Sequence, residues 1–220
     1  MSLKSTKDSD KPNGPYVIVI GRQFGSGARR IGKIIASLLG FDYYDSELLS
    51  HAAERLGFAK EIFIENDEKK PSTLRTLLQG AYGIADNFHP VSLSGEGIYA
   101  EQSRVIKDIC KERSSVIVGR TADYILRNHP SMLSVFLHSP VEIRAEAIVR
   151  RGEADNIDDA IDIARRRDKR REAYYNFYTG EDRWGKADNY HLSIDTSGLD
   201  EKTVAELIVS VAKSKFLGIE

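Results

Sequence analysis

Short apolar runs alternate along the chain with longer segments in which apolar and polar residues recur at helical spacing. Residues 16–20 are β-branched or aromatic and have no polar face, which predicts a strand buried on both sides. Further strand-like runs follow at 41–44, 115–118, 132–137 and 190–194. Strands that alternate with helices predict an α/β fold with a five-stranded, mostly parallel sheet.

The segments between these strands predict amphipathic helices. Apolar residues share one face within residues 31–39, and Gly40 ends that pattern. Similar patterns cover residues 48–56, 74–84, 99–112, 157–178 and 204–211. The run Ser139-Pro140-Val141-Glu142 predicts another helix start, in which Ser139 is the N-cap.

Two stretches lack this regular patterning. Residues 1–15 are polar without apolar period, which predicts a disordered arm. Residues 58–97 combine a charged turn with a loop rich in Gly, Ser and Pro, which predicts an inserted, mobile sub-region. The length of 220 residues otherwise suits a single domain over residues 16–220.

Composition narrows the classes of partner. The 32 Lys and Arg residues balance 33 Asp and Glu, and this net charge of -1 argues against a duplex nucleic-acid surface. No apolar run approaches the roughly 20 residues of a membrane span, and we see no secretory leader. A single cysteine, Cys110, excludes an intramolecular disulfide, and the five histidines show no metal-ligand spacing. We therefore expect a cytoplasmic protein without a structural metal, and its oligomeric state stays open.

A loop with two closely spaced glycines connects the first strand to the first helix, Gly21-Arg22-Gln23-Phe24-Gly25-Ser26-Gly27-Ala28-Arg29-Arg30. Glycines let backbone N–H groups turn inward, and the helix N-terminus adds about half a positive charge. Arginines at that positive end are unfavourable unless an anion lies nearby. The loop therefore predicts a site for nucleotide phosphates. The candidate nucleotide-binding residues are Gly25, Ser26, Gly27, Ala28, Arg29 and Arg30.

The loop departs from the common phosphate-binding motifs. A P-loop of the form G-x-x-x-x-G-K-[ST] would have glycine, lysine and a hydroxyl where this chain has Arg22, Ala28 and Arg29. Arg29 or Arg30 could supply the lysine's catalytic charge, but no residue replaces the hydroxyl that binds magnesium. A dinucleotide site, which needs a glycine at Arg30, is the weaker alternative. The second alternative is a purely structural turn, in which the glycines serve only to reach unusual dihedral angles.

A basic cluster lies within the predicted helix 157–178. Every residue from Arg165 to Arg171 is basic except Asp168. Such a segment predicts a lid, residues 153–186, that closes over transferring phosphates and stabilises their charge. The lid residues are Arg166, Arg167, Asp168, Arg170 and Arg171, of which Arg167, Arg170 and Arg171 are also candidate catalytic residues. A solvated helix surface and an RNA-binding face remain alternatives, although RNA would favour aromatic residues between the basic ones.

Two of the predicted strands end in residues suited to an acceptor. Arg120 and Asp123 follow residues 115–118, and Asp45 follows residues 41–44. Parallel sheets bind ligands at the carboxyl ends of their strands, and an arginine there suits a bidentate contact with a monophosphate. We therefore predict that these three residues bind substrate. A salt bridge between Arg120 and Asp123, and an N-cap role for Asp45, are the structural alternatives.

Taken in order, these motifs resemble the cytidylate kinase-like family, a branch of the P-loop nucleoside monophosphate kinases. The matching segments are Arg22 to Gly27 with Ile31-Gly32, Tyr43-Tyr44-Asp45, Val118 to Tyr124, Arg167 to Arg170, Phe177-Tyr178 and Trp184-Gly185. The resemblance implies a P-loop three-layer sandwich, an inserted helical monophosphate-binding region and a helical arginine lid. It places Gly25 to Arg30 on donor phosphates, and Asp45 and Arg120 near the acceptor. Two positions depart from cytidylate kinases, which have lysine at Ala28 and aspartate at Thr121.

Three hypotheses of function follow. The first is ATP- and Mg²⁺-dependent phosphoryl transfer to a small nucleotide, such as CMP or dCMP, with Arg29, Arg30 and the lid arginines neutralising charge. The second is a nucleotide-binding protein that has lost catalysis, which Ala28 and Arg29 motivate. The third is an RNA-associated protein that uses the helix from Arg165 to Arg171.

Overall fold

The computed structural model describes residues 14–55 and 95–217. Its elements are β1 (Val17–Arg22), α1 (Ala28–Leu39), β2 (Asp42–Tyr44), α2 (Ser46–Arg55), α4 (Gly95–Glu112), β3 (Ser115–Val118), α5 (Ala122–Ile125), β4 (Met132–His138), α6 (Val141–Arg150), α7 (Ile157–Thr179), β5 (Leu192–Asp195) and α8 (Glu201–Leu217). The predicted α/β class is confirmed. Nearly all of the predicted disordered arm (1–15) and of the inserted region (58–97) lies outside the described residues.

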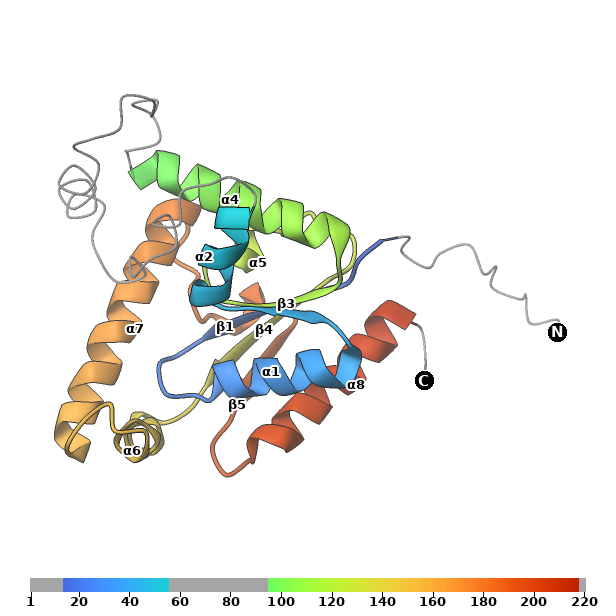
Figure 1. Ribbon diagram of the computed structural model, residues 1–220. Helices are drawn as coiled ribbons and strands as arrows, with labels where there is room; N and C mark the ends of the chain where they lie inside the picture. Colours follow the sequence, from blue (N-terminus) through green and yellow to red (C-terminus); the bar gives the residue numbers. More distant parts are fainter. Residues whose placement is uncertain (1–13, 56–94, 218–220) are drawn as a thin grey trace, which may run out of the picture.

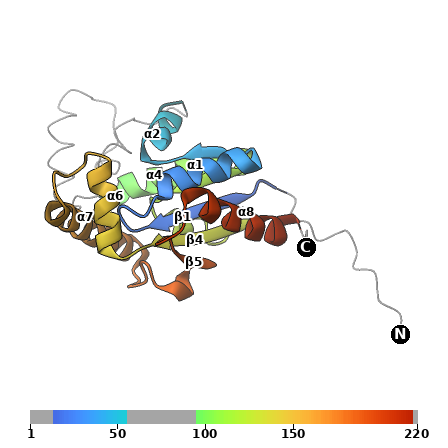
Figure 2. The same ribbon diagram turned by 90° about the horizontal axis from the view of Figure 1, so that it is seen from below.

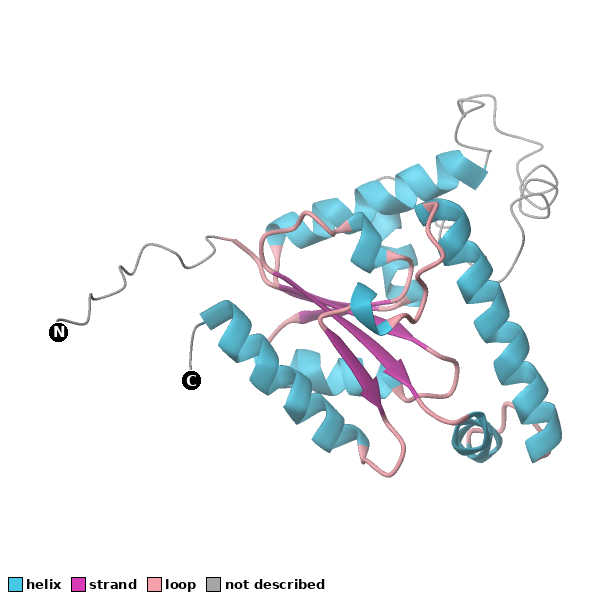
Figure 3. Cartoon of the chain, turned by 180° about the vertical axis from the view of Figure 1, so that it is seen from behind, coloured by secondary structure: helices cyan, strands magenta, loops and turns pink. Residues whose placement is uncertain are grey.

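The five strands form one parallel sheet in the order β2-β3-β1-β4-β5. Strand β1 lies at its centre, paired with β3 on one side and with β4 on the other. Its residues from Val17 to Ile20 are at most 1% exposed, which explains their continuous apolar character. Figure 3 shows the strand arrows pointing toward α7.

Helices cover both faces of the sheet and make a three-layer sandwich. On one face, Ile31 and Ile35 of α1 and Val204 and Ile208 of α8 pack against side chains of β1, β3 and β4. On the other face, α2, α4 and α5 contribute to a second apolar cluster, which includes Cys110. Figures 1 and 2 show α1 and α8 together on one side of the sheet, and α4 on the other side. The alternation read from the sequence thus corresponds to the observed layers.

Helices α6 and α7 form a third cluster near the carboxyl ends of the strands. Phe24 of the loop after β1 is buried there with Ala145 and Ile148 of α6 and Ala160 and Ala164 of α7. The glycine loop therefore belongs to the same packed unit as α6 and the basic helix α7.

A helix starts where residues 139–142 predicted one, but the predicted N-cap is wrong. Helix α6 begins at Val141 with Pro140 as its N-cap, and no side chain caps it. Ser139 instead uses its backbone, because its N–H donates to Gln23 Oε1 at 3.2 Å and its carbonyl accepts from Arg144 Nε at 2.8 Å. Both bonds lead to the glycine loop or to a residue that contacts it. The segment read as a capping box therefore positions the loop.

Candidate functional site

The loop between β1 and α1 continues the sheet and then turns into the helix. Gln23 N–H donates to Leu137 O at 2.9 Å, and Ser26 Oγ donates to the Gln23 carbonyl at 2.9 Å. Gly25 has a φ of 90°, and a Cβ there would lie 2.9 Å from Cβ of Arg144. Only glycine meets both demands, because L-residues with side chains are strained at that φ and no space exists for a methyl group. The predicted role of this glycine in a tight phosphate loop fits its geometry.

A buried ion pair holds the loop from behind. Arg144 of α6 donates to Asp168 Oδ2 of α7 at 2.7 Å and to the Phe24 carbonyl at 2.8 Å. Asp168 Oδ1 accepts from Phe24 N–H at 2.6 Å. Burial raises the pKa of the Asp168 carboxyl, and the Phe24 N–H and the Arg144 charge oppose that shift. The predicted lid residue Asp168 is thus an anchor for the glycine loop, and Arg144 is a site residue that sequence reasoning missed.

A first pocket lies over the loop and has a volume of about 380 Å³. That volume falls at the lower end of the range for small-molecule sites, about 300–1,000 Å³. Its cationic lining residues are Arg22, Arg29, Arg30, Lys33, Arg151, Arg167 and Arg171. Backbone N–H groups of the helix start and this ring of cations favour a polyanion. The nucleotide-binding residues predicted from Gly25 to Arg30 all line this pocket.

Arg29 and Arg30 lie at the outer edge of the loop pocket. The Arg29 side chain is 67% exposed, and its Nε lies 3.9 Å from Asp45 Oδ2. The Arg30 side chain is 65% exposed, and its Nη1 lies 3.6 Å from Glu201 Oε1. Both arginines therefore have carboxylate partners on other elements. Their proposed contact with nucleotide phosphates stays a prediction.

Asp45 caps the N-terminus of α2, which is the structural role that the sequence offered as an alternative to substrate binding. Its Oδ1 accepts from the N–H groups of Glu47 and Leu48 at 3.1 and 3.2 Å. The other oxygen faces Arg29 and accepts from Tyr43 Oη at 3.3 Å. Burial and the nearby Asp45 carboxylate raise the pKa of Tyr43, so its hydroxyl stays a donor. A helix cap and a role in acceptor binding use different oxygens of Asp45 and are compatible.

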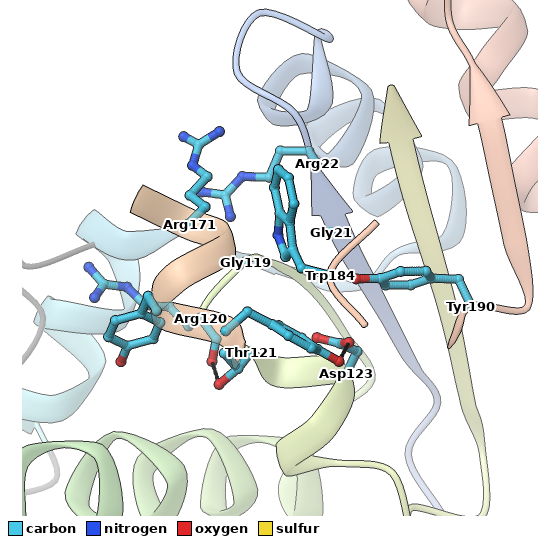
Figure 4. Close-up of a pocket in the computed structure, with 11 residues that line it drawn as sticks. Gly21, Arg22, Gly119, Arg120, Thr121, Asp123, Arg171, Trp184 and Tyr190 are labelled. Carbon is cyan, nitrogen blue, oxygen red and sulfur yellow. Dashed lines mark hydrogen bonds between the residues drawn. The ribbon is translucent and has the colours of Figure 1, made fainter. Parts of the chain in front are cut away.

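The second pocket lies between the carboxyl ends of β1 and β3 (Figure 4). It has a volume of about 30 Å³, enough for about one water molecule. Gly119, Arg120 and Thr121 have φ values of 86°, 61° and 50°, so the chain leaves β3 in a left-handed turn. Such strain in side-chain-bearing residues is concentrated at functional sites. The predicted acceptor residue Arg120 is only 3% exposed and lines this pocket.

Asp123 lies in the same pocket and bonds to the basic helix. Its Oδ2 accepts from Tyr175 Oη at 2.8 Å, and Tyr175 Oη in turn accepts from Asn189 Nδ2 at 2.8 Å. Burial raises the pKa of the Asp123 carboxyl against the opposing hydrogen bond from Tyr175. The structural alternative, a salt bridge between Asp123 and Arg120, stays untested.

The predicted lid residues point in different directions on α7. Arg167 lies over the Phe24 ring at 4.3 Å, and the side chain of Arg171 is 13% exposed and lines both pockets. Arg166 lines a separate pocket among acidic residues of the α6–α7 connection, and Arg170 is exposed. The structure therefore brings Arg167, Asp168 and Arg171 to the glycine loop and leaves Arg166 and Arg170 away from both pockets.

Sequence reasoning assigned no role to several residues of the second pocket. Arg22, Trp184 and Tyr190 line it together with Arg120. Trp184 stands edge-on to Phe136 with ring centroids 5.3 Å apart. Arg22 appeared only as the residue that replaces a P-loop glycine. Its position directly after a buried strand was the available signal, because strand ends in α/β sheets face ligands.

The structure offers no dedicated metal site among residues 14–55 and 95–217, where no cluster of three His, Cys, Asp or Glu residues could hold an ion. The residue at the magnesium-binding hydroxyl position is Arg29, and the neighbouring Ser26 Oγ donates to a backbone carbonyl. These residues do not fit a protein-held magnesium ion. Within the same ranges, none of the helices combines the length and apolar character of a membrane span.

Comparison with known proteins gives one family. A model of the cytidylate kinase-like family matches residues 17–198. The chain is 28% identical over 188 residues to the cytidylate kinase of Pyrococcus abyssi, a match that covers 84% of this chain and 87% of that protein. The cytidylate kinase of Pyrococcus furiosus is likewise 28% identical over 188 residues, which cover 84% and 82%.

Solved structures support the fold. An uncharacterized protein from Eubacterium ventriosum superposes with a TM-score of 0.67 at 24% identity, and the match covers 90% of this chain and 99% of that one. Shikimate kinase from Acinetobacter baumannii, in complex with shikimate, gives a TM-score of 0.50 at 15% identity and covers 92% and 94%. At these identities the two structures bear on the fold alone, and they support the parallel α/β architecture.

Proposed function

The chain belongs to the cytidylate kinase-like family, and on that premise we propose that it transfers a phosphoryl group from ATP to a small nucleotide, CMP or dCMP above all. The relatives are cytidylate kinases, which supports a pyrimidine monophosphate as acceptor. The remaining support comes from the arrangement of the two pockets.

One observation carries the proposal: a cation-lined pocket over the glycine loop adjoins a second pocket that contains the buried Arg120. Phosphoryl transfer needs two phosphate-bearing ligands held close together and in line, with positive charge around the group that moves. A triphosphate on the loop and an acceptor phosphate directed at Arg120 would satisfy that requirement once the second pocket, which has room for about one water molecule, widens to admit the phosphate. A protein that bound one nucleotide as a ligand would need only the first pocket.

Each part of the site has a proposed role. Residues Gly25 to Arg30 hold the donor phosphates, and Asp45, Arg120 and Asp123 bind the acceptor. Arg29, Arg30, Arg167 and Arg171 supply charge, and the α7 region, residues 153–186, acts as the lid. Because the protein supplies position and charge, no covalent intermediate with a side chain is required. Residues 58–97 complete the acceptor site within a single kinase-like domain of residues 16–220.

Magnesium enters this proposal with ATP. Mg²⁺ is commonly held by substrate phosphates and water with few protein ligands, which suits a chain that has Arg29 at the hydroxyl position. The ion supplies charge neutralisation when it is bound to the donor phosphates.

The missing P-loop lysine favours a second candidate, a family member that binds nucleotide without turnover. Ala28 occupies that position and is 5% exposed, so it offers only a methyl group. The two candidates predict equal binding of ATP and opposite results in a turnover assay.

The test is an ADP-release assay with ATP, Mg²⁺ and a panel of nucleoside monophosphates, run beside calorimetry with a non-hydrolysable ATP analogue. We expect analogue binding and steady ADP release that depends on CMP or dCMP. A Lys202→Ala variant should behave like wild type in both assays, because Lys202 lies on α8 in an exposed pair with Glu206. Analogue binding without ADP release from any acceptor would select the non-catalytic candidate, and absence of both would exclude a nucleotide kinase.

A further inference from the structure

Two arginines line both pockets. Arg22, the last residue of β1, and Arg171 of α7 each border the loop pocket and the pocket at the ends of β1 and β3. Among the residues that the structure describes, no other lines both of these pockets. A group transferred between a ligand in the first pocket and a ligand in the second would therefore lie close to Arg22 and Arg171.

Arg22 is placed by the sheet itself. It lies opposite Leu137 in the register of β1 with β4, and its side chain is half-buried. Its guanidinium lies against Gly119 so closely that a Cβ at Gly119 would collide with it. In Figure 4 the side chains of Arg22 and Arg171 extend to the same side of the pocket. A strand end and a close backbone contact hold a charged group more rigidly than a loop does.

The arginines named from the motif have a different position. Arg29 and Arg30 are two-thirds exposed, pair with Asp45 and Glu201, and border the loop pocket but not the second one. Ala28, at the lysine position, has no charge. Arg22 occupies a position where the P-loop motif has glycine, so the chain lacks the usual cation and carries an unusual one in the same loop.

We propose that Arg22 is a catalytic residue that supplies the charge of the absent P-loop lysine, with Arg171 as its partner on the lid; this rests on the proposed kinase function. An oxygen of the acceptor phosphate forms a bond to the γ-phosphorus of ATP while the bond to the β–γ bridging oxygen breaks, and its electron pair leaves with ADP. Arg22 contacts the equatorial oxygens of the moving group and stabilises their charge. It stays protonated throughout, because a guanidinium does not release its proton in proteins.

The test compares Arg22→Gln and Arg22→Lys with Arg113→Ala. Arg113 is an exposed arginine at the opposite, amino end of β3, where it pairs with Asp42 at 3.5 Å. We expect Arg22→Gln to lower kcat at least about 100-fold, the usual effect of removing one preorganised charge-stabilising donor. Affinity for the non-hydrolysable ATP analogue should change less than about 3-fold, because the charge acts on the moving group. Arg22→Lys should recover part of kcat, since it restores the charge without the planar fork.

A transition-state mimic separates this role from a structural one. Wild-type protein and Arg113→Ala should bind ADP with aluminium fluoride and CMP tightly, and Arg22→Gln should lose that affinity in proportion to its kcat. Melting temperatures identify a folding defect, in which case Arg22→Lys carries the comparison. If wild type turns over and Arg22→Gln keeps the wild-type kcat, Arg22 has no catalytic role. The same conclusion follows if the only change in Arg22→Gln is a higher KM for ATP. If wild type shows no turnover at all, the proposed function fails and this assignment fails with it.

Discussion

The ion pair between Arg144 and Asp168 offers the sharpest test of how the glycine loop is held. An Asp168→Asn variant keeps the shape of the side chain and removes its charge. Asparagine Oδ1 can still accept the Phe24 N–H, but its amide NH₂ then faces the Arg144 guanidinium, which is also a donor. The substitution therefore leaves a buried arginine against another donor.

The burial of the pair sets the expected magnitude. The side chains of Arg144 and Asp168 are only 6% and 13% exposed, and the two groups lie 2.7 Å apart. Removal of one partner of a buried pair costs about 3–5 kcal/mol, because the remaining charge stays desolvated. For a domain of this size that loss lowers the Tm by roughly 6–20 °C. Arg144→Met should have a similar effect. The double variant should lose about 1–3 kcal/mol less stability than the sum of the two single-variant losses.

Urea unfolding followed by fluorescence, together with calorimetry of the ATP analogue, measures both consequences. The analogue should bind more weakly to Asp168→Asn than to wild type, because the Phe24–Gly25 turn loses its anchor. Lys186→Ala, which removes an exposed pair with Asp182, is the matched control and should cost less than about 1 kcal/mol. If Asp168→Asn is as mild as this control and binds the analogue normally, the ion pair does not support the loop.

Three further predictions concern single residues. Burial raises the pKa of the Cys110 thiol to about 12, so a thiol reagent at pH 8 should label it only after unfolding. Stability should also fall as pH rises from about 9 to 12, where the unfolded chain releases the thiol proton and the folded chain keeps it. Cys110→Ala should reduce that slope in pH-dependent urea unfolding, and the remainder belongs to buried tyrosines such as Tyr43, whose pKa is also raised. Asp45→Ala should lose about 1 kcal/mol of stability with the α2 cap, whereas Asp45→Asn should keep the cap and raise KM for CMP; an unchanged KM would leave Asp45 a cap alone. Gly119→Ala should lower kcat as Arg22 variants do, because a Cβ at a φ of 86° displaces the Arg22 guanidinium, and a wild-type kcat would contradict that contact.

Much of the fold could be predicted because its signals are local. The apolar runs at Val17 to Ile20 and at 115–118 read as strands without knowledge of their neighbours, since burial on both faces removes polar residues from the run itself. The glycine loop was recognisable for the same reason, because a positive φ at Gly25 selects the residue type directly. The family resemblance added the order of these motifs along the chain.

The functions of charged residues were harder to read. The arginines between Arg165 and Arg171 look equivalent in sequence, yet Arg171 borders both pockets and Arg170 is exposed. Asp168, the one acidic residue among them, anchors the glycine loop. Ser139 satisfied the pattern of a helix cap and serves the loop instead. In each case the outcome depends on which residue of a distant element lies opposite.

The sequence by itself therefore determined the five strands, most of the described helices and the glycine loop, since each rests on periodicity or residue type within a few neighbouring positions. The tertiary structure alone decided the strand order, the Arg144–Asp168 pair and the double position of Arg22. Those features depend on how helices and strands far apart in sequence pack together. The role of a charged side chain depends on how deeply it is buried and on which groups it contacts. Neither property can be read from the residues next to it in the sequence.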